Sequence, residues 1–198
     1  MGVIVVALFG LGVWGARLYG HPIQALLGAY PALGIAVFFA SSVLAVLVPV
    51  LTNLPLLPLA VMAYGPVWTA LILLTGWVLG AALSFALGRH ARALVLRRFP
   101  GMQRHGEIER LIHPRQRLWS LVLLRVTFPV DVLSYALGMF SPRTSALENA
   151  ASTALGAAPF AVVFALFPTL SGASQWIVFG ASVLVFLIYT TWMLHRPP

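Results

Sequence analysis

Apolar residues run along this chain in long, nearly unbroken stretches that short polar segments separate. The stretches with the length and composition of a membrane-spanning helix, of which the first is the shortest, are 3–18, 31–51, 68–88, 145–167 and 175–194. The first stretch has neither a basic start nor a small-residue cleavage site, which favours an uncleaved span over a signal peptide. Because that first stretch is at the short end for a span, we predict an all-α polytopic membrane protein with about four full spans.

Two further apolar stretches contain residues that break a helix. Residues 52–65 carry Pro55 and Gly65 and are too short to cross a bilayer on their own. Residues 118–140 contain Pro129, so an uninterrupted helix is not expected there. Irregular backbone at membrane depth is tolerated only where it is buried in protein or lines a cavity. We predict that both stretches are re-entrant helical hairpins, each of which enters and leaves the membrane on the same side.

Composition agrees with a membrane protein and bounds the size of the domain. Hydrophobic residues make up 61% of the 198 residues and charged residues only 8%. Soluble domains carry roughly 25% charged residues. The chain is therefore predicted to form a single integral membrane domain over residues 1–198. It contains no cysteine, so disulfides and thiolate metal sites are excluded.

The arginines predict how the domain is oriented in the membrane. The net charge of +8 comes from twelve arginines and no lysine, and eight of the arginines lie in the basic loop 89–117. If both hairpins are re-entrant, every arginine except Arg125 falls on one side, which the positive-inside rule makes cytoplasmic. Because the arginines are interleaved with spans, we expect them to set orientation, and we expect no nucleic-acid partner. Within the loop, residues 91–99 are basic and amphipathic and could lie along the headgroups.

The two halves of the chain resemble each other in arrangement. In each half, a proline-containing stretch ends with a tyrosine and a glycine and is followed by a glycine-containing helix. The residues concerned are Tyr64, Gly65, Gly76 and Gly80 in the first half and Tyr135, Gly138 and Gly156 in the second. On the predicted topology the two hairpins enter from opposite sides, so the halves form an inverted repeat. Broken segments at corresponding places of inverted halves point to a transporter-type site near the midplane.

Arg125 and Asp131 are the strongest candidates for functional groups. They lie six residues apart within residues 118–140, and a charge at bilayer depth is costly enough to be a functional group by default. Arg125 could anchor a phosphate, since the planar guanidinium binds two oxygens at once, or it could anchor Asp131. Asp131 could respond to protons or cations. The alternative is a structural ion pair that fixes the hairpin, although such pairs rarely gain stability over apolar packing.

Three other polar residues are candidates, each with a structural alternative. Asn53, together with backbone amides of the first hairpin, could hold an anionic headgroup or could merely cap the hairpin helix. Glu148 follows Ser145 by three residues, which is a capping-box pattern. Arg143 could bind a headgroup at the interface or could only set the topology. The histidines lack the spacing of metal ligands, and we expect neither a metal nor a cofactor.

In order and spacing, the motifs of this chain resemble the DedA-like, VTT-domain superfamily, also called the SNARE-associated Golgi protein family. They are Asn53-Leu-Pro55-x-x-Pro58, Tyr64-Gly65-Pro66, Gly76-x-x-x-Gly80-x-x-x-x-Phe85-x-x-Gly88-Arg89, Leu124-Arg125, Pro129-x-Asp131 and Tyr135-x-x-Gly138. The resemblance covers about 31–170. Pro55, Pro129 and Tyr135, which belong to these motifs, join the candidate substrate- or ion-binding residues. Many members of the family carry an acidic residue in the first hairpin region, where this chain offers only Asn53.

The resemblance implies two facing re-entrant hairpins and a role in lipid scrambling or flipping, including the recycling of polyprenyl-phosphate carriers in bacteria. We predict a transporter, scramblase or flippase of a phosphate-bearing lipid or small anion in the bacterial inner membrane, with loop 89–117 in the cytoplasm. Its partners would be membrane lipids with anionic or polyprenyl-phosphate headgroups, while proton coupling and a homo-oligomer stay open.

Two other classes of function are weighed against transport. One is a scaffold that does not transport, whose basic loop binds anionic lipid or a partner. The other is an intramembrane enzyme, which is not expected. No histidine lies at membrane depth to act as a base, Asp131 has no acidic partner in the membrane, and neither Gly-x-Ser-x-Gly nor His-Glu-x-x-His occurs.

Overall fold

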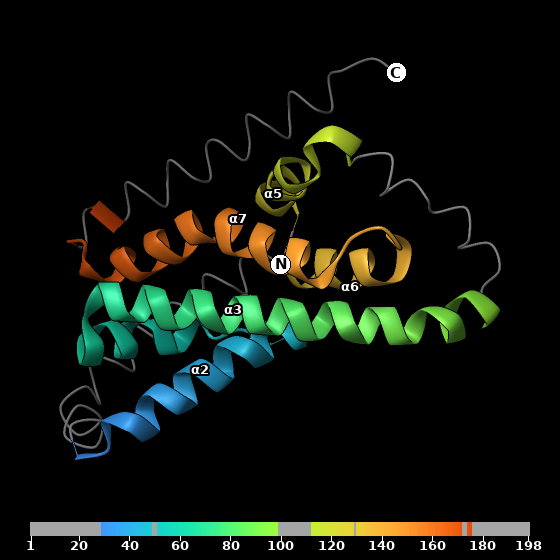
Figure 1. Ribbon diagram of the computed structural model, residues 1–198. Helices are drawn as coiled ribbons and strands as arrows, with labels where there is room; N and C mark the ends of the chain where they lie inside the picture. The colour runs from blue at the N-terminus through green and yellow to red at the C-terminus, as the bar shows by residue number, and fades with distance from the viewer. Residues whose placement is uncertain (1–28, 49–50, 99–111, 129, 172–173, 176–198) are drawn as a thin grey trace, which may run out of the picture.

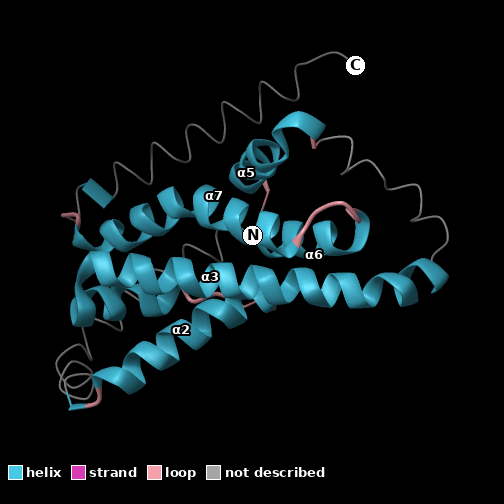
Figure 2. Cartoon of the chain, viewed as in Figure 1, coloured by secondary structure: helices cyan, strands magenta, loops and turns pink. Residues whose placement is uncertain are grey.

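The computed structural model describes residues 29–48, 51–98, 112–128, 130–171 and 174–175, and every regular element in these ranges is a helix (Figures 1 and 2). The elements are α2 (Pro31–Leu47), η1 (Leu54–Leu56), α3 (Leu57–Arg98), η3 (Pro114–Gln116), α5 (Arg117–Thr127), α6 (Val130–Phe140), α7 (Ala146–Leu166) and η4 (Phe167–Thr169). Two helical stretches in these ranges, Leu54–Ala93 and Ala146–Thr169, are long and apolar enough to cross a membrane. The predicted span at 3–18 and nearly all of that at 175–194 lie outside the described residues.

α2 and the first part of α3 form a helical hairpin. α2 has 17 residues and ends at Leu47, because Val48 precedes a proline and adopts an extended conformation (φ −119°, ψ 100°). The chain then returns through η1 to Tyr64, whose hydroxyl donates to the carbonyl of Pro31 at 3.4 Å. The stretch 31–51, predicted to be a full span, is therefore mainly one arm of this hairpin. The hairpin itself is larger than the 52–65 stretch that the sequence predicted.

Gly65 separates α3 into a short and a long part. Its φ of 77° and ψ of 165° lie outside the helical region, and only glycine adopts such a conformation readily. Pro66 then begins the long part, where a proline is tolerated in the first turn. This part continues as one helix to Arg98 (Figure 1). As far as Arg98, the basic stretch at 91–99 extends α3, since no proline interrupts the sequence before Pro100.

α5 and α6 form the second hairpin, so residues 118–140 are two helices with a break between them, while their re-entrant course in a membrane stays a prediction. The break between them falls at Phe128, which precedes a proline and is extended (φ −115°, ψ 149°). The ends of this hairpin are also held together, because Arg117 Nη2 donates to Thr144 Oγ1 at 3.3 Å. α7 then runs back along α3 toward its Gly65 end (Figure 1).

Glycines allow the helices around α3 to pack closely. A Cβ atom at Gly80 would lie 2.8 Å from the carbonyl oxygen of Val43 in α2, and one at Gly76 would lie 2.6 Å from Cβ of Ser42, so these two small residues allow close contact between α2 and α3. On the other side, α6 crosses α3 where Gly88 faces Gly138. A Cβ at Gly88 would lie 2.6 Å from the carbonyl oxygen of Tyr135. α6 thus packs along α3, whereas α5 packs against α7.

Apolar residues form the interior and also much of the surface. One buried cluster, where α2, α3 and α7 meet, contains Phe38, Leu57, Ala60, Leu73 and Ala161. A second, between α3 and the second hairpin, contains Phe85, Ile112, Leu121, Leu133 and Leu137. Large apolar side chains such as Val67 and Leu123 are more than 60% exposed. Extensive apolar exposure of this kind is typical of a surface that faces hydrocarbon or a partner.

Candidate functional site

Arg125 lies at the centre of the polar contacts between the second hairpin and α7. Its side chain projects from the last turn of α5 and is only 2% exposed. Nη1 donates to the carbonyl of Val130 and to Ser134 Oγ, both at 2.8 Å, which joins the two arms of the hairpin across the break. Nη2 donates to Asn149 Oδ1 in α7. Every one of these acceptors is neutral.

One side of the Arg125 guanidinium is left without a partner. The Nε atom is buried and makes no hydrogen bond with the described residues. Nη1 uses both of its hydrogens and Nη2 uses one, so Nε–H and one Nη2–H remain. These neighbouring nitrogens can bind two oxygens of one phosphate or carboxylate group. The site is therefore a buried cation with donors to spare.

Asp131 does not neutralise Arg125. The two residues form no ion pair, so the structure does not support the alternative of a structural ion pair that fixes the hairpin. Arg125 points toward Val130, Ser134 and Asn149, while Asp131 lies half-buried in the first turn of α6. A carboxylate is favourable near a helix N-terminus, where backbone N–H groups point outward. With the part of the chain that the structure describes, Asp131 makes neither a hydrogen bond nor an ion pair.

Asn149 and Gly156 shape the α7 side of the site. They lie seven residues apart, which places both on the face of α7 that meets α5. Asn149 is fully buried, and its Nδ2 also donates to the carbonyl of Ala81 in α3 at 3.1 Å. A Cβ at Gly156 would lie 2.6 Å from Cβ of Arg125, so only glycine admits the arginine at this distance.

Neither Asn149 nor Ser134 was predicted to belong to the site. The signal available in the sequence was the seven-residue spacing between Asn149 and Gly156, which puts a buried amide and a small residue on one helix face. That spacing does not reveal which helix the face meets. The contact with Arg125 joins residues 24 positions apart and depends on the tertiary fold.

Asn53 and Pro55 belong to the turn of the first hairpin and not to the Arg125 site. Asn53 is buried, and its Nδ2 donates to Ser42 Oγ in α2 at 2.8 Å. Its side chain makes no capping hydrogen bond to η1. The alternative of a helix cap is therefore wrong, and Asn53 instead links the turn to α2, while headgroup binding by Asn53 stays a prediction. Pro55 lies in the first turn of η1 and is half-buried.

Tyr135 connects the two hairpins. Its hydroxyl donates to the carbonyl of Leu47, the last residue of α2, at 2.8 Å. Ser84 of α3 supports the same end of α2, since its Oγ donates to the carbonyl of Val46 at 3.3 Å. These bonds satisfy carbonyl groups that a helix end leaves open. Pro129, the remaining motif residue of the second hairpin, lies outside the described residues.

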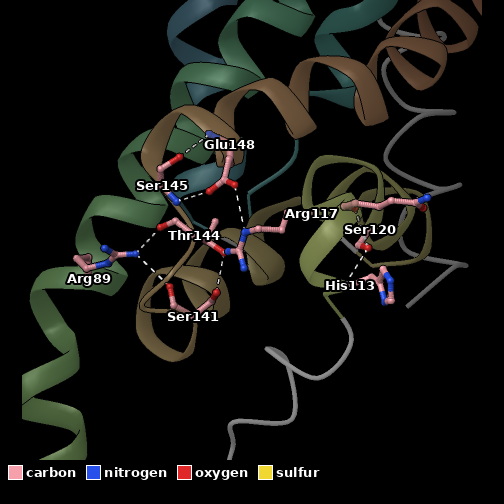
Figure 3. Close-up of polar contacts among 9 residues, drawn as sticks. Arg89, His113, Arg117, Ser120, Ser141, Thr144, Ser145 and Glu148 are labelled. Atoms are coloured by element: carbon pink, nitrogen blue, oxygen red, sulfur yellow. Dashed lines mark hydrogen bonds and ion pairs between the residues drawn. The ribbon is translucent and has the colours of Figure 1, made fainter.

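A second polar cluster lies where the α6–α7 turn meets α5 (Figure 3). Ser145 Oγ accepts from the backbone N–H of Glu148 at 3.1 Å, and Glu148 Oε2 accepts from the backbone N–H of Ser145 at 2.7 Å. The predicted capping box is confirmed. Glu148 Oε1 also forms an ion pair with Arg117 Nε at 3.2 Å. Glu148 thus caps the N-terminus of α7 and, through its ion pair with Arg117, connects that end of α7 to α5.

Arg89 closes the same turn from the α3 side (Figure 3). Nη2 donates to the carbonyls of Ser141 and Thr144 at 3.1 and 2.7 Å, and the guanidinium lies 4.7 Å from the centre of the Phe85 ring. Arg143 is exposed in this turn and makes no hydrogen bond or ion pair with the described residues. The hydrogen bonds of Arg89 with the described residues are all to backbone carbonyls of this turn, and its Nε, like that of Arg125, is buried without a hydrogen-bond partner among those residues.

Comparison with known protein families now places the chain. The family model of the VTT domain matches residues 48–170, which is more than half of the sequence. The chain belongs to the VTT-domain family. The resemblance predicted from the sequence is thus confirmed, although the match begins at residue 48 and not at 31. Neither a comparison with curated proteins nor one with solved structures returned a match.

The VTT domain contains the whole of the site described above. The matched residues include α5, α6 and α7 and the long part of α3. The family and the two long apolar helices together identify a membrane protein. The outward-facing apolar side chains of α3 and α5 agree with that environment.

Proposed function

We propose that the chain is polytopic and that its two hairpins are re-entrant and inverted. The first hairpin begins and ends near Gly65, where Tyr64 bonds to Pro31. The second begins and ends near Arg89, which bonds to the carbonyl of Thr144. In a helix, residues 66–89 rise roughly 35 Å, slightly more than a hydrocarbon thickness of about 30 Å. If this helix crosses the bilayer, the hairpins open to opposite sides, with loop 89–117 in the cytoplasm of a bacterial inner membrane.

The function that this arrangement supports best is transport of a phosphate-bearing lipid or a small anion across the membrane. The observation that carries it is the buried Arg125 guanidinium. Its hydrogen-bond acceptors are all neutral, it pairs with no carboxylate of the described residues, and its Nε makes no hydrogen bond with them. A buried charge without a counter-ion is costly, so a ligand that supplies negative charge would relieve that cost. The expectation that the protein is not an enzyme is kept in this proposal.

Access to Arg125 requires the two arms of the second hairpin to separate. α6 is attached to α3 through Gly88 and Gly138, whereas α5 is attached to α7 through Gly156. Arg125 bridges the arms through Val130 and Ser134. The Nε–H and the remaining Nη2–H take no part in that bridge, so a phosphate bound to them would not compete with it. Opening of the arms, which breaks the bridge, would leave both close helix contacts undisturbed.

Asp131 is the group through which a proton could affect the cycle. It is a half-buried carboxylate one residue from Val130, whose carbonyl accepts from Arg125. With the described residues its side chain makes neither a hydrogen bond nor an ion pair. We therefore propose Asp131 as the residue that couples transport to a proton or cation gradient.

The test is reconstitution of the full chain into vesicles that contain fluorescent lipids. Translocation of phosphatidic acid, phosphatidylglycerol and phosphatidylcholine is measured by dithionite quenching, and inorganic phosphate uptake is measured separately with a radiolabel. These arms distinguish a lipid headgroup from a free anion. We expect Arg125→Ala to slow the transported anion at least about tenfold, because one charge-assisted bidentate contact is worth more than one factor of ten. Asp131→Asn should remove the dependence on a pH gradient.

Arg97→Ala is the matched control, since it removes an exposed arginine of the basic segment. It should leave translocation unchanged. Equal activity of Arg125→Ala and the wild type would exclude transport at this site. If activity fell with Arg97→Ala and not with Arg125→Ala, the alternative of a scaffold with a lipid-binding basic loop would be supported.

A further inference from the structure

We infer that Asn149 is a positioning residue that determines charge selectivity, because it holds Arg125 in place without neutralising it. The substrate class that follows is a net-anionic phosphate, as a lipid headgroup or as free phosphate, in preference to a zwitterionic headgroup. This inference rests on the proposed function. Beyond the proposed function, it identifies Asn149 as the neutral partner that leaves the positive charge of Arg125 uncompensated.

The orientation of the Asn149 amide is determined by its two partners. Its Nδ2 donates to the carbonyl of Ala81, which can only accept, and its Oδ1 accepts from Arg125 Nη2, which can only donate. Rotating the amide by half a turn would set oxygen against oxygen and N–H against N–H. Because Asn149 is fully buried, water cannot relieve that mismatch. Asn149 thus connects the guanidinium rigidly to α3.

Asn149 is neutral, and so are the other hydrogen-bond acceptors of Arg125, so the positive charge of the guanidinium is not compensated by any of them. The other acceptors of Arg125 are a backbone carbonyl and a hydroxyl. An aspartate at position 149 would have nearly the same shape and could accept from Arg125 through a carboxylate. It would cancel the positive charge that attracts a phosphate, and it would face the carbonyl of Ala81 without a donor. Asparagine therefore satisfies the geometry of the site and preserves its charge.

Asn149 makes none of the contacts that join Ser145, Glu148 and Arg117 at the N-terminus of α7. The preceding residue, Glu148, pairs with Arg117 and closes the capping box, so the carboxylate of this turn is directed away from Arg125. Thr153 lies one turn further along and bonds only to the carbonyl of Asn149 within the described contacts. A substitution at Thr153 therefore perturbs the same turn of α7 without touching the guanidinium.

The experiment compares Asn149→Asp, Asn149→Ala and the control Thr153→Val in the full chain. The readout is the ratio of phosphatidic acid to phosphatidylcholine translocation in vesicles, with inorganic phosphate uptake as a parallel arm. Asn149→Asp should lower the ratio, or the phosphate uptake, at least about tenfold, because a carboxylate beside the guanidinium removes most of its attraction for an anion. Asn149→Ala and Thr153→Val should keep the ratio of the wild type, even if both rates fall.

Two results would overturn the inference. One is an unchanged ratio in Asn149→Asp, and the other is an equal loss of the ratio in Asn149→Ala, which would assign Asn149 a purely structural role. If Asn149→Asp does not fold, Ser134→Asp, which puts a carboxylate beside the same guanidinium, takes its place with the same expected loss of the ratio. These failures are distinguishable from failure of the proposed function, in which the wild type itself would move no anion or Arg125→Ala would have no effect.

Discussion

A single arginine organises the polar interior of this VTT-domain protein. Arg125 is almost fully buried, bridges the arms of the second hairpin and meets α7 through Asn149. Its importance could be predicted from the sequence, because an arginine within an apolar stretch is costly. Its partner could not. Arg125 and Asp131 are close in sequence, but the break at Phe128 directs the guanidinium toward residues of α6 and α7 that only the tertiary fold brings near.

At this scale the space around Arg125 gives a prediction about Gly156. Replacing Gly156 with alanine would put a Cβ 2.6 Å from Cβ of Arg125 and 3.2 Å from the carbonyl oxygen of Val122. We expect Gly156→Ala to destabilise the protein by about 1–3 kcal/mol, since overpacking displaces neighbours. The measurement is the free energy of unfolding in detergent.

Whether Gly156→Ala raises or lowers the free energy of unfolding decides if α5 packs closely against α7 at this position. In an unobstructed helix, replacing glycine with alanine stabilises by roughly 0.5–1 kcal/mol. A stabilised Gly156→Ala variant would therefore mean that α5 does not approach α7 as described. Leu155→Ala, at a residue that is 52% exposed on the same turn, serves as the control and should have a much smaller effect.

At the scale of elements, the molecule consists of two hairpins that are each followed by a long helix. The breaks at Gly65 and near Pro129 were predictable, because proline and glycine act locally on the backbone. The extent of the first hairpin was not. An apolar run of about twenty residues has the same composition whether it crosses a membrane or turns back. The difference lies in contacts such as Tyr64 with Pro31, which hold the hairpin ends together.

Tyr135 gives the prediction for this scale, because it links the first hairpin to the second. Tyr135→Phe removes a 2.8 Å hydrogen bond to Leu47 and leaves a helix-end carbonyl without that donor. We expect a loss of about 1 kcal/mol, or a decrease in Tm of roughly 2–4 °C, in thermal unfolding. Tyr64→Phe is the matched control, since its bond to Pro31 is longer, at 3.4 Å, and solvent-exposed. An equal decrease for both variants would contradict a specific role for Tyr135.

At the scale of the whole molecule, the hairpins open toward opposite ends of the long part of α3. The arginine distribution predicts that the end with the basic segment faces the cytoplasm, and this orientation stays a prediction. The close crossing of α3 and α6 could not be predicted in the same way. Gly88 and Gly138 are separated by 50 positions, and a small residue does not indicate which helix it meets.

The natural absence of cysteine makes the topology directly testable. Single cysteines in place of Tyr30 and Val67 should react with a membrane-impermeant maleimide from one side of the membrane. Cysteines in place of Arg97 and Arg143 should react from the other side. The reason is that each hairpin begins and ends at the same end of α3. Labelling of positions 30 and 67 from opposite sides would show that α2 crosses the bilayer and would refute the re-entrant first hairpin.

The central claim is that the uncompensated charge of Arg125 recognises a phosphate group. The most direct measurement is equilibrium binding of phosphatidic acid and phosphatidylcholine to the purified wild type and to Arg125→Gln, which removes the charge but keeps hydrogen-bond donors. The wild type should bind phosphatidic acid at least about tenfold more tightly than phosphatidylcholine, and Arg125→Gln should abolish the difference. A preference for phosphatidic acid that persists undiminished in Arg125→Gln would contradict the claim.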